Sequence, residues 1–190
     1  TEGKYRHEQV MYYERCLRLY HFRKPTIASI QGACVAAGLM LASMCDLIIA
    51  ADDAFFANPV ARMSGVGVEL LVEPYEIGFR KAKELLLTGN RLSAEEARQL
   101  GLVNRVVPRA ELSAATAELA SQVALVPPIT AEMTKRSLNE AAALGGKENA
   151  WRQHFMIHQF TSATETALHM ADERDRKGSL KEVFEERDRG

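Results

Sequence analysis

The sequence predicts an α/β fold that continues into an all-helical C-terminal region. The main evidence is the stretch from Lys24 to Ala54, in which two apolar, β-branched runs flank a run of uncharged residues. We interpret this stretch as a buried strand over 26–30, a helix over 35–44 and a second buried strand over 47–50. A helix that is apolar on every side is surrounded by protein or lipid, and about ten residues is half of a bilayer span. We therefore expect this helix in the protein core.

Composition and charge are typical of a soluble chain that buries a core. Of the 190 residues, 47% are hydrophobic, and the net charge of −1 gives no electrostatic reason to bind nucleic acid or an anionic membrane. The three cysteines, Cys16, Cys34 and Cys45, lack metal-binding spacing, which indicates free thiols in a reducing compartment. Since the sequence also shows no signal-like segment, we predict a cytoplasmic protein with neither a nucleic-acid nor a membrane partner.

Local patterns predict the remaining elements. Residues 4–22 carry apolar side chains at helical spacing, 54–57 has the pattern of a short third strand, and 79–87 is an amphipathic helix. Ser93 and Glu96 form a capping box that begins another helix. A further strand is predicted over 102–107, and helices are predicted over 110–125, 129–144, 148–160, 164–174 and 179–187.

One stretch of the predicted α/β region has no clear period. Residues 60–77 contain two glycines, a proline and three acids: Glu69, Glu73 and Glu76. An irregular stretch of this length inside a compact domain is usually functional or mobile. We expect Glu73 and Glu76 to be surface or helix-entry charges.

The small residues Ala36, Ala37 and Gly38 stand at the start of the predicted core helix. The first N–H groups of a helix lack partners within the helix, and small side chains let a ligand approach them, which suits the binding of an oxyanion. The alternative is that the small residues only permit tight packing between helix and strand. The local pattern alone favours this alternative.

Three blocks of the sequence resemble one family. The run KPTIASIQGACVAAGLMLASMCDLIIAADDAFF resembles the core signature of the crotonase family, the enoyl-CoA hydratase/isomerase superfamily. RKAKELLLTGNRLSAEEARQLGLVNRVVP resembles its next block, and GSLKEVFEERD its last helix. The resemblance implies a partial spiral of β-β-α turns over 1–108, followed by a helical trimerisation region over 109–190. It therefore also implies a homotrimer or a dimer of trimers.

The resemblance implies an acyl-CoA thioester as substrate and an enolate intermediate. Members of the family hold the enolate with two backbone N–H groups, and Ala37, flanked by Ala36 and Gly38, matches one of the two donors. The other donor comes from an earlier turn, which this sequence lacks. No metal or redox cofactor is implied, because CoA arrives with the substrate.

Two positions depart from the family pattern. Met40 and Val60 stand where a typical hydratase has its two glutamates, so we expect them to line the acyl site without transferring protons. Glu69 is the remaining candidate acid or base: with one extra residue in the stretch 60–67, the resemblance aligns it with an acidic residue of some dienoyl-CoA isomerase relatives, and its apolar neighbours would favour its protonated form. The alternative is a solvated loop acid. Arg62 is a candidate contact to a CoA phosphate or to an acyl polar group. Phe184, with Arg187, matches positions that help to cover the CoA of a neighbouring subunit.

These observations leave two hypotheses about function. The first is an enzyme of the enoyl-CoA hydratase/isomerase family that transfers protons with Glu69 or with a group outside this chain. The second is a non-catalytic acyl-CoA-binding protein, which the apolar Met40 and Val60 favour. We expect structural or surface roles for all five histidines and no metal site. His154 and His158 are four residues apart on one helix face, but no third ligand accompanies them.

Overall fold

The computed structural model describes residues 2–63 and 65–187. The chain begins with a long helical element made of α1 (Glu2–Glu8), a π-helical segment (Gln9–Glu14) and α2 (Arg15–Tyr20). This element confirms the helix predicted over 4–22. Its apolar side chains lie on one face, and those of Tyr13, Cys16 and Tyr20 are buried there.

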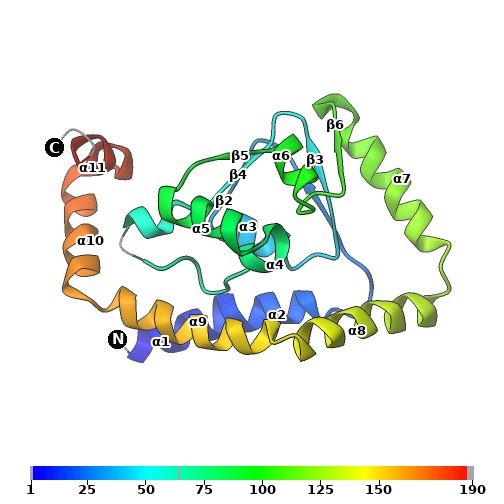
Figure 1. The fold of residues 1–190 in the computed structure, drawn as a ribbon, viewed down its shortest axis with the longest axis horizontal. Helices are drawn as coiled ribbons and strands as arrows, with labels where there is room; N and C mark the ends of the chain where they lie inside the picture. The colour runs from blue at the N-terminus through cyan, green and yellow to red at the C-terminus, as the bar shows by residue number, and fades with distance from the viewer. Residues whose placement is uncertain (1, 64, 188–190) are drawn as a thin grey trace.

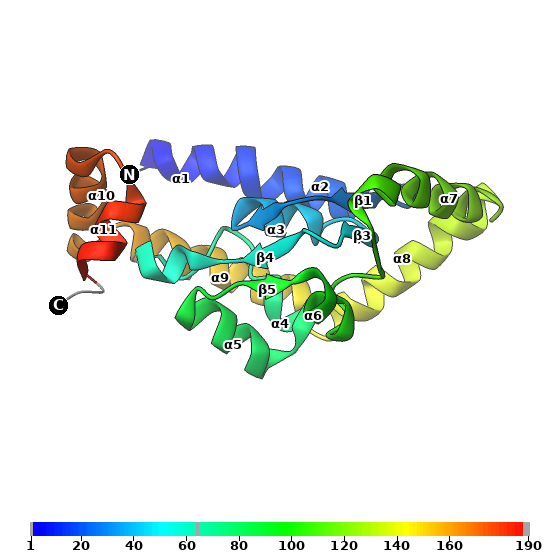
Figure 2. The ribbon, with the colours of Figure 1, turned by 90° about the horizontal axis from the view of Figure 1, so that it is seen from above.

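In the part of the chain that the structure describes, six short strands form two separate three-stranded sheets. In the first sheet β3 (Leu47–Ala51) lies between β1 (Ile27–Ile30) and β6 (Arg105–Val107), and all three strands are parallel. The predicted strands at 26–30 and 47–50 are therefore confirmed. The strand predicted over 102–107 is shorter than expected. The strands lie between the α1–α2 helix on one side and α5 on the other, as Figure 2 shows.

The second sheet explains why the core helix is shorter than predicted. In this sheet β4 (Phe55–Ala57) pairs in parallel with β2 (Ala33–Val35) and antiparallel with β5 (Leu92–Ser93). Because β2 joins this ladder, the helix can begin only after it, as α3 (Ala37–Ala42). The predicted bounds of 35–44 are wrong at both ends, and β5 was not predicted.

The irregular stretch contains two short helical elements. A 3-10 helix covers Pro59–Met63, and α4 covers Glu73–Ile77. Two helices follow, α5 (Phe79–Thr88) and α6 (Ala94–Gln99), and the capping box of α6 is present with both of its hydrogen bonds. The part between the 3-10 helix and α4, residues 65–72, has no regular structure and is called the 65–72 segment below.

The described part of the C-terminal region contains five α-helices, and all five were predicted to within a few residues. Figure 1 shows α8 and α9 along the base of the molecule, α7 at one end, and α10 with α11 at the other. Of the described helices, none combines the length and apolar character that a membrane crossing requires. The bounds are α7 (Leu112–Ala124), α8 (Pro128–Leu144), α9 (Lys147–Ser162), α10 (Glu165–Lys177) and α11 (Leu180–Arg187).

The buried face of α9 packs against the N-terminal helix. The indole of Trp151 packs edge-on against the ring of Tyr20, with 5.2 Å between the ring centroids. The ring of Phe155 contacts that of Tyr13 at 4.9 Å. Met40, from α3, belongs to the same apolar cluster. This packing places α9 beside the N-terminal helix and α3, where the candidate site lies.

Candidate functional site

Three side chains of α9 hold the backbone of the 65–72 segment. The indole Nε1–H of Trp151 donates to the carbonyl of Leu71 at 2.9 Å, and the Nε2–H of His154 donates to that of Val68 at 2.8 Å. One turn further along α9, the Nδ1–H of His158 donates to the carbonyl of Gly67 at 3.0 Å. These bonds give both α9 histidines a structural role, one of the two roles expected for them, while Nε2 of His158 is directed at Glu8. The segment is irregular in shape but fixed in place by hydrogen bonds.

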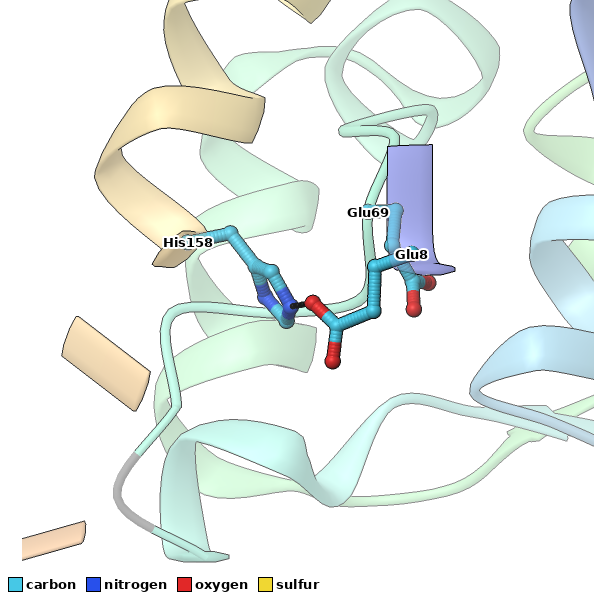
Figure 3. Close-up of side chains that lie close together, drawn as sticks. All are labelled: Glu8, Glu69 and His158. Atoms are coloured by element: carbon cyan, nitrogen blue, oxygen red, sulfur yellow. Dashed lines mark ion pairs between the residues drawn. The ribbon is translucent and has the colours of Figure 1, made fainter. Parts of the chain in front are cut away.

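The side chain of Glu69 lies beside two ionisable groups from distant parts of the sequence. Its apolar neighbours Val68 and Leu70 are buried in the cluster with Met40, whereas the half-buried Glu69 meets Glu8 of α1 and His158 of α9. One ligand atom from each of the three residues lies within 4.8 Å of the others. Figure 3 shows the side chains converging on a common space. We call Glu8, Glu69 and His158 the Glu–Glu–His cluster.

Within the cluster, Glu8 has the most contacts. Its Oε2 atom lies 3.4 Å from Nε2 of His158 and accepts a hydrogen bond from Nε2 of Gln159 at 2.5 Å. Its Oε1 atom lies 3.7 Å from Nζ of Lys4. The side chains of Glu8 and His158 are only 13% and 11% exposed. Two carboxylates and an imidazole are therefore assembled in a largely enclosed place, where they can exchange protons or bind a cation.

The start of α3 is open, as binding at its backbone requires. Ala36 has a positive φ of 51°, which is uncommon for a residue other than glycine, and its N–H donates to the carbonyl of Ala57 at 2.9 Å. Ala37 and Gly38 are exposed, and a Cβ atom added at Gly38 would meet no atom within 4 Å. Within this chain, close packing therefore does not account for the absence of a side chain at Gly38.

Met40 and Val60, the two apolar replacements, lie on the same apolar cluster. Met40 is buried and Val60 packs against the cluster from the 3-10 helix. Neither side chain offers a group that can transfer a proton. They form apolar walls close to Val68 and Leu70, which flank Glu69 in the sequence.

Glu73 was predicted to be a surface or helix-entry charge; it begins α4, as a helix-entry residue does, but it does not lie on the surface. Glu73 is 2% exposed, its Oε1 atom accepts a hydrogen bond from Nδ2 of Asn58 at 2.6 Å, and burial raises its pKa. Among the described residues, neither Oε2 of Glu73 nor the buried hydroxyl of Ser43 has a hydrogen-bond partner. Both residues line a small cavity bounded by α3, α4 and α5. Glu76, in contrast, is half-buried and forms an ion pair with Lys147 at 3.2 Å.

Arg62 and Phe184 contact one another within this chain. The guanidinium carbon of Arg62 lies 4.6 Å from the centroid of the Phe184 ring, at the distance of a cation–π contact. The contact joins the 3-10 helix to α11. The side chain of Arg187 lies outside the described part of the structure. The predicted role of Phe184 at a neighbouring subunit stays a prediction.

Comparison with known proteins adds a family and a set of relatives. Residues 1–181 match the family model described as enoyl-CoA hydratase/isomerase. Over 164 residues the chain is 44% identical to the putative enoyl-CoA hydratase EchA13 of Mycobacterium tuberculosis, covering 86% of this chain and 52% of that protein. It is 37% identical over 144 residues to a probable mitochondrial enoyl-CoA hydratase of Dictyostelium discoideum, covering 74% of this chain and 51% of that protein.

Solved structures agree with these matches. A probable enoyl-CoA hydratase from Mycobacterium thermoresistibile superimposes with a TM-score of 0.83 at 46% identity, covering 84% of this chain and 65% of that one. An enoyl-CoA hydratase/isomerase from Xanthobacter autotrophicus Py2 superimposes with a TM-score of 0.84 at 31% identity, covering 93% of this chain and 66% of that one. The chain spans about half the length of these two curated relatives.

Proposed function

Because the chain belongs to the enoyl-CoA hydratase/isomerase family and has the crotonase fold, we propose that it acts on an acyl-CoA thioester through an oxyanion-stabilised enolate. Glu69 is the proposed proton-transfer group. The observation that carries this proposal is the position of Glu69 beside Glu8 and His158, next to an apolar wall. CoA enters as part of the substrate.

The open start of α3 supports binding of the thioester oxygen. The first N–H groups of an α-helix have no acceptor within the helix, and the N–H of Ala37 is the first in α3. Since the N–H of Ala36 already donates to Ala57, the Ala37 N–H is the proposed donor to the oxyanion. Ala36 and Gly38 keep the approach clear. The family resemblance implies a second donor from an earlier turn.

Proton transfer then follows a simple balance. The Glu69 carboxylate takes a proton from a carbon of the acyl chain, and the electron pair left behind moves to the thioester oxygen as an enolate. The protonated Glu69 returns its proton to another carbon, which shifts the double bond. Met40 and Val60 line the acyl chain, and Arg62 contacts a polar group of the substrate. Because Met40 and Val60 cannot transfer protons and Glu69 acts alone, isomerisation is favoured over hydration by a pair of glutamates.

A substrate panel with one substitution tests the proposal. The protein is assayed spectroscopically with enoyl- and dienoyl-CoA thioesters of several chain lengths. Glu69→Gln is expected to lower turnover by about 10²–10⁴-fold, the usual contribution of a general acid or base, and to leave acyl-CoA binding unchanged. Glu14→Gln, at an exposed acid of the N-terminal helical element, is the matched control. Full turnover by the Glu69 variant would remove Glu69 from the mechanism.

A second candidate function is non-catalytic binding of acyl-CoA. The apolar character of Met40 and Val60 favours it, because both offer only apolar surface to an acyl chain. Calorimetric titration with acyl-CoA separates the two functions. Binding together with no turnover across the whole panel supports the binding protein, and turnover that depends on Glu69 supports the enzyme.

The assembly and the location of the protein are part of the proposal. Large apolar side chains on the C-terminal helices are exposed in the single chain: Leu125, Ile129, Leu138, Leu144, Met156 and Phe160. We propose that residues 109–190 form the oligomerisation region of a homotrimer or a dimer of trimers, and that 1–108 form the acyl-CoA region. Sedimentation velocity on the protein measures the assembly, and a monomer at micromolar concentration would contradict it. The cytoplasmic location stays a prediction.

A further inference from the structure

The Glu–Glu–His cluster has the composition of a metal site as well as that of a proton-transfer site. Glu8 comes from α1, Glu69 from the 65–72 segment and His158 from α9, so the fold brings together three ligands that are far apart in the sequence. Imidazole combined with carboxylates is a common ligand set for Zn²⁺ and for other divalent transition metals.

One distance within the cluster matches that of a tetrahedral site, and the other two are below 4.8 Å. Zn²⁺ ligands lie about 2.0–2.1 Å from the ion, so neighbouring ligand atoms in a tetrahedral site are about 3.3 Å apart. Oε2 of Glu8 and Nε2 of His158 are 3.4 Å apart, which already matches this spacing. The Glu69 carboxylate is within 4.8 Å of both and needs only a small side-chain movement to complete three ligands.

The orientation of His158 is that of a metal ligand. Its Nδ1–H donates to the carbonyl of Gly67 at 3.0 Å, so the neutral ring has its lone pair on Nε2, the atom that faces Glu8. A backbone carbonyl on the far nitrogen fixes the tautomer and the ring plane of metal-ligating histidines in the same way. The carbonyl is itself held in place, because His154 binds the next residue of the segment.

The charge of the cluster also favours a cation. Two carboxylates and Nε2 of His158 face one space, and the side chains of Glu8 and His158 are mostly withdrawn from water. The ammonium group of Lys4 lies 3.7 Å from Glu8 on a side chain that is 52% exposed. An ion with two positive charges placed between the three groups would offset both carboxylates at short range.

We propose that Glu8, Glu69 and His158 bind a divalent transition-metal ion of the Zn²⁺ type, with the remaining coordination position open to water. The proposal is separate from the proposed function, since binding of the ion is measured with no acyl-CoA present. If both are correct, a bound ion occupies Glu69 and withdraws it from proton transfer, so the ion lowers turnover.

The test uses untagged protein and two ions. Co²⁺ titration is expected to give visible absorption bands at one ion per chain, without the charge-transfer band that a thiolate ligand would add. Calorimetry with Zn²⁺ gives the affinity. Glu8→Gln and His158→Asn are each expected to weaken binding by at least tenfold, about the lower bound for disturbing a metal site. Glu69→Gln is a third variant at a half-buried position, for the case in which the first two fail to fold.

Two control variants separate binding at the Glu–Glu–His cluster from binding at the protein surface. Glu14→Gln and His169→Asn change exposed residues of the same types, and His169 itself lies 3.7 Å from a carboxylate oxygen of Glu173, so these variants detect surface binding. The absence of bands and heat in the unmutated protein overturns the proposal. Binding that survives in all three cluster variants, or a thiolate band, overturns it as well. The turnover assay is run with EDTA, so failure of the metal site leaves the test of the proposed function intact.

Discussion

Glu69 and Glu73 are four residues apart, yet the two ends of this short stretch lie in opposite environments. Glu69 is half-buried and faces the carboxylate of Glu8 and the imidazole of His158. Glu73 is almost fully buried, with one hydrogen bond from Asn58 and one carboxylate oxygen that has no hydrogen-bond partner among the described residues. The first acid is placed where proton or cation exchange is possible. The second is placed where ionisation is costly.

The difference arises from helix α9, which fixes the backbone between the two acids. Trp151 binds the carbonyl of Leu71, midway between them, and His154 binds that of Val68. With the carbonyls directed at α9, the side chains of Val68 and Leu70 enter the apolar cluster and that of Glu69 lies with the polar groups. The hydrogen bonds to the backbone, more than the acids themselves, therefore decide what each carboxylate can do.

Removing the central anchor is expected to have the largest effect. Trp151→Ala deletes a fully buried indole and leaves the carbonyl of Leu71 without its donor, so we expect a loss of about 3–5 kcal/mol in the free energy of unfolding. Urea denaturation measures this loss. Trp151→Phe keeps much of the apolar contact and is expected to lose less. Equal losses for the two variants would contradict this expectation and would show that the hydrogen bond to Leu71, which both variants lack, contributes more than the packing.

The Glu73 end is expected to lose stability as the pH rises. Burial raises the pKa of Glu73 above the 4.5 of a free glutamate, so its contribution to stability is fully present below pH 4.5 and is lost as the pH rises through the raised pKa. Glu73→Gln keeps an oxygen that accepts from Asn58 but cannot ionise. The unfolding free energy of the unmutated protein, minus that of the variant, should therefore fall between pH 4.5 and 8. A constant difference would show that Glu73 ionises freely.

The hydrogen bond of His154 to Val68, near the Glu69 end, is expected to make stability depend on pH in the opposite direction, with a smaller effect. Burial holds the pKa of His154 below the 6.5 of a free histidine, although its bond to Val68 opposes the shift. Its contribution to stability is therefore present above pH 6.5 and is lost as the pH falls through the lowered pKa. His154→Gln still donates to the carbonyl and stays neutral. Urea denaturation at pH 5 and 7.5 measures the free energy of unfolding of both proteins. Relative to the unmutated protein, the variant should be more stable at pH 5 than at pH 7.5, and an equal difference at the two pH values would contradict this.

Much of the fold could be predicted from local patterns in the sequence. The capping box at Ser93 and Glu96 needs only four residues and is present as predicted. The C-terminal helices follow from helical periodicity and from breaks at glycine and proline. The start of α3 could not be predicted in this way. Whether residues 33–35 belong to a helix or to a strand depends on the distant partner β4, which no local pattern contains.

The candidate site was predicted in part, for the same reason. Glu69 was identified from the family resemblance and from its apolar neighbours, whereas His158 was noted beside His154 on one helix face but was expected to have a structural or surface role. Glu8 carried no signal, since its position is that of an ordinary helical acid and its partners lie in α9 and the 65–72 segment. Glu73 was misread because a buried acid and an exposed acid have the same local sequence pattern. Its burial depends on Asn58 and on the cavity beneath α3.

The π-helical segment Gln9–Glu14 determines how the two ends of the N-terminal helix are rotated relative to one another. Each residue turns an α-helix by about 100°, and a π-helical turn, closed by bonds five residues apart, accommodates an additional residue. The segment therefore sets the rotational phase of Glu8 relative to the buried face at Tyr13, Cys16 and Tyr20. A regular α-helix over the same residues would rotate Glu8 by about 100° relative to that face and away from His158. The cluster is encoded in a count of residues as well as in their identities.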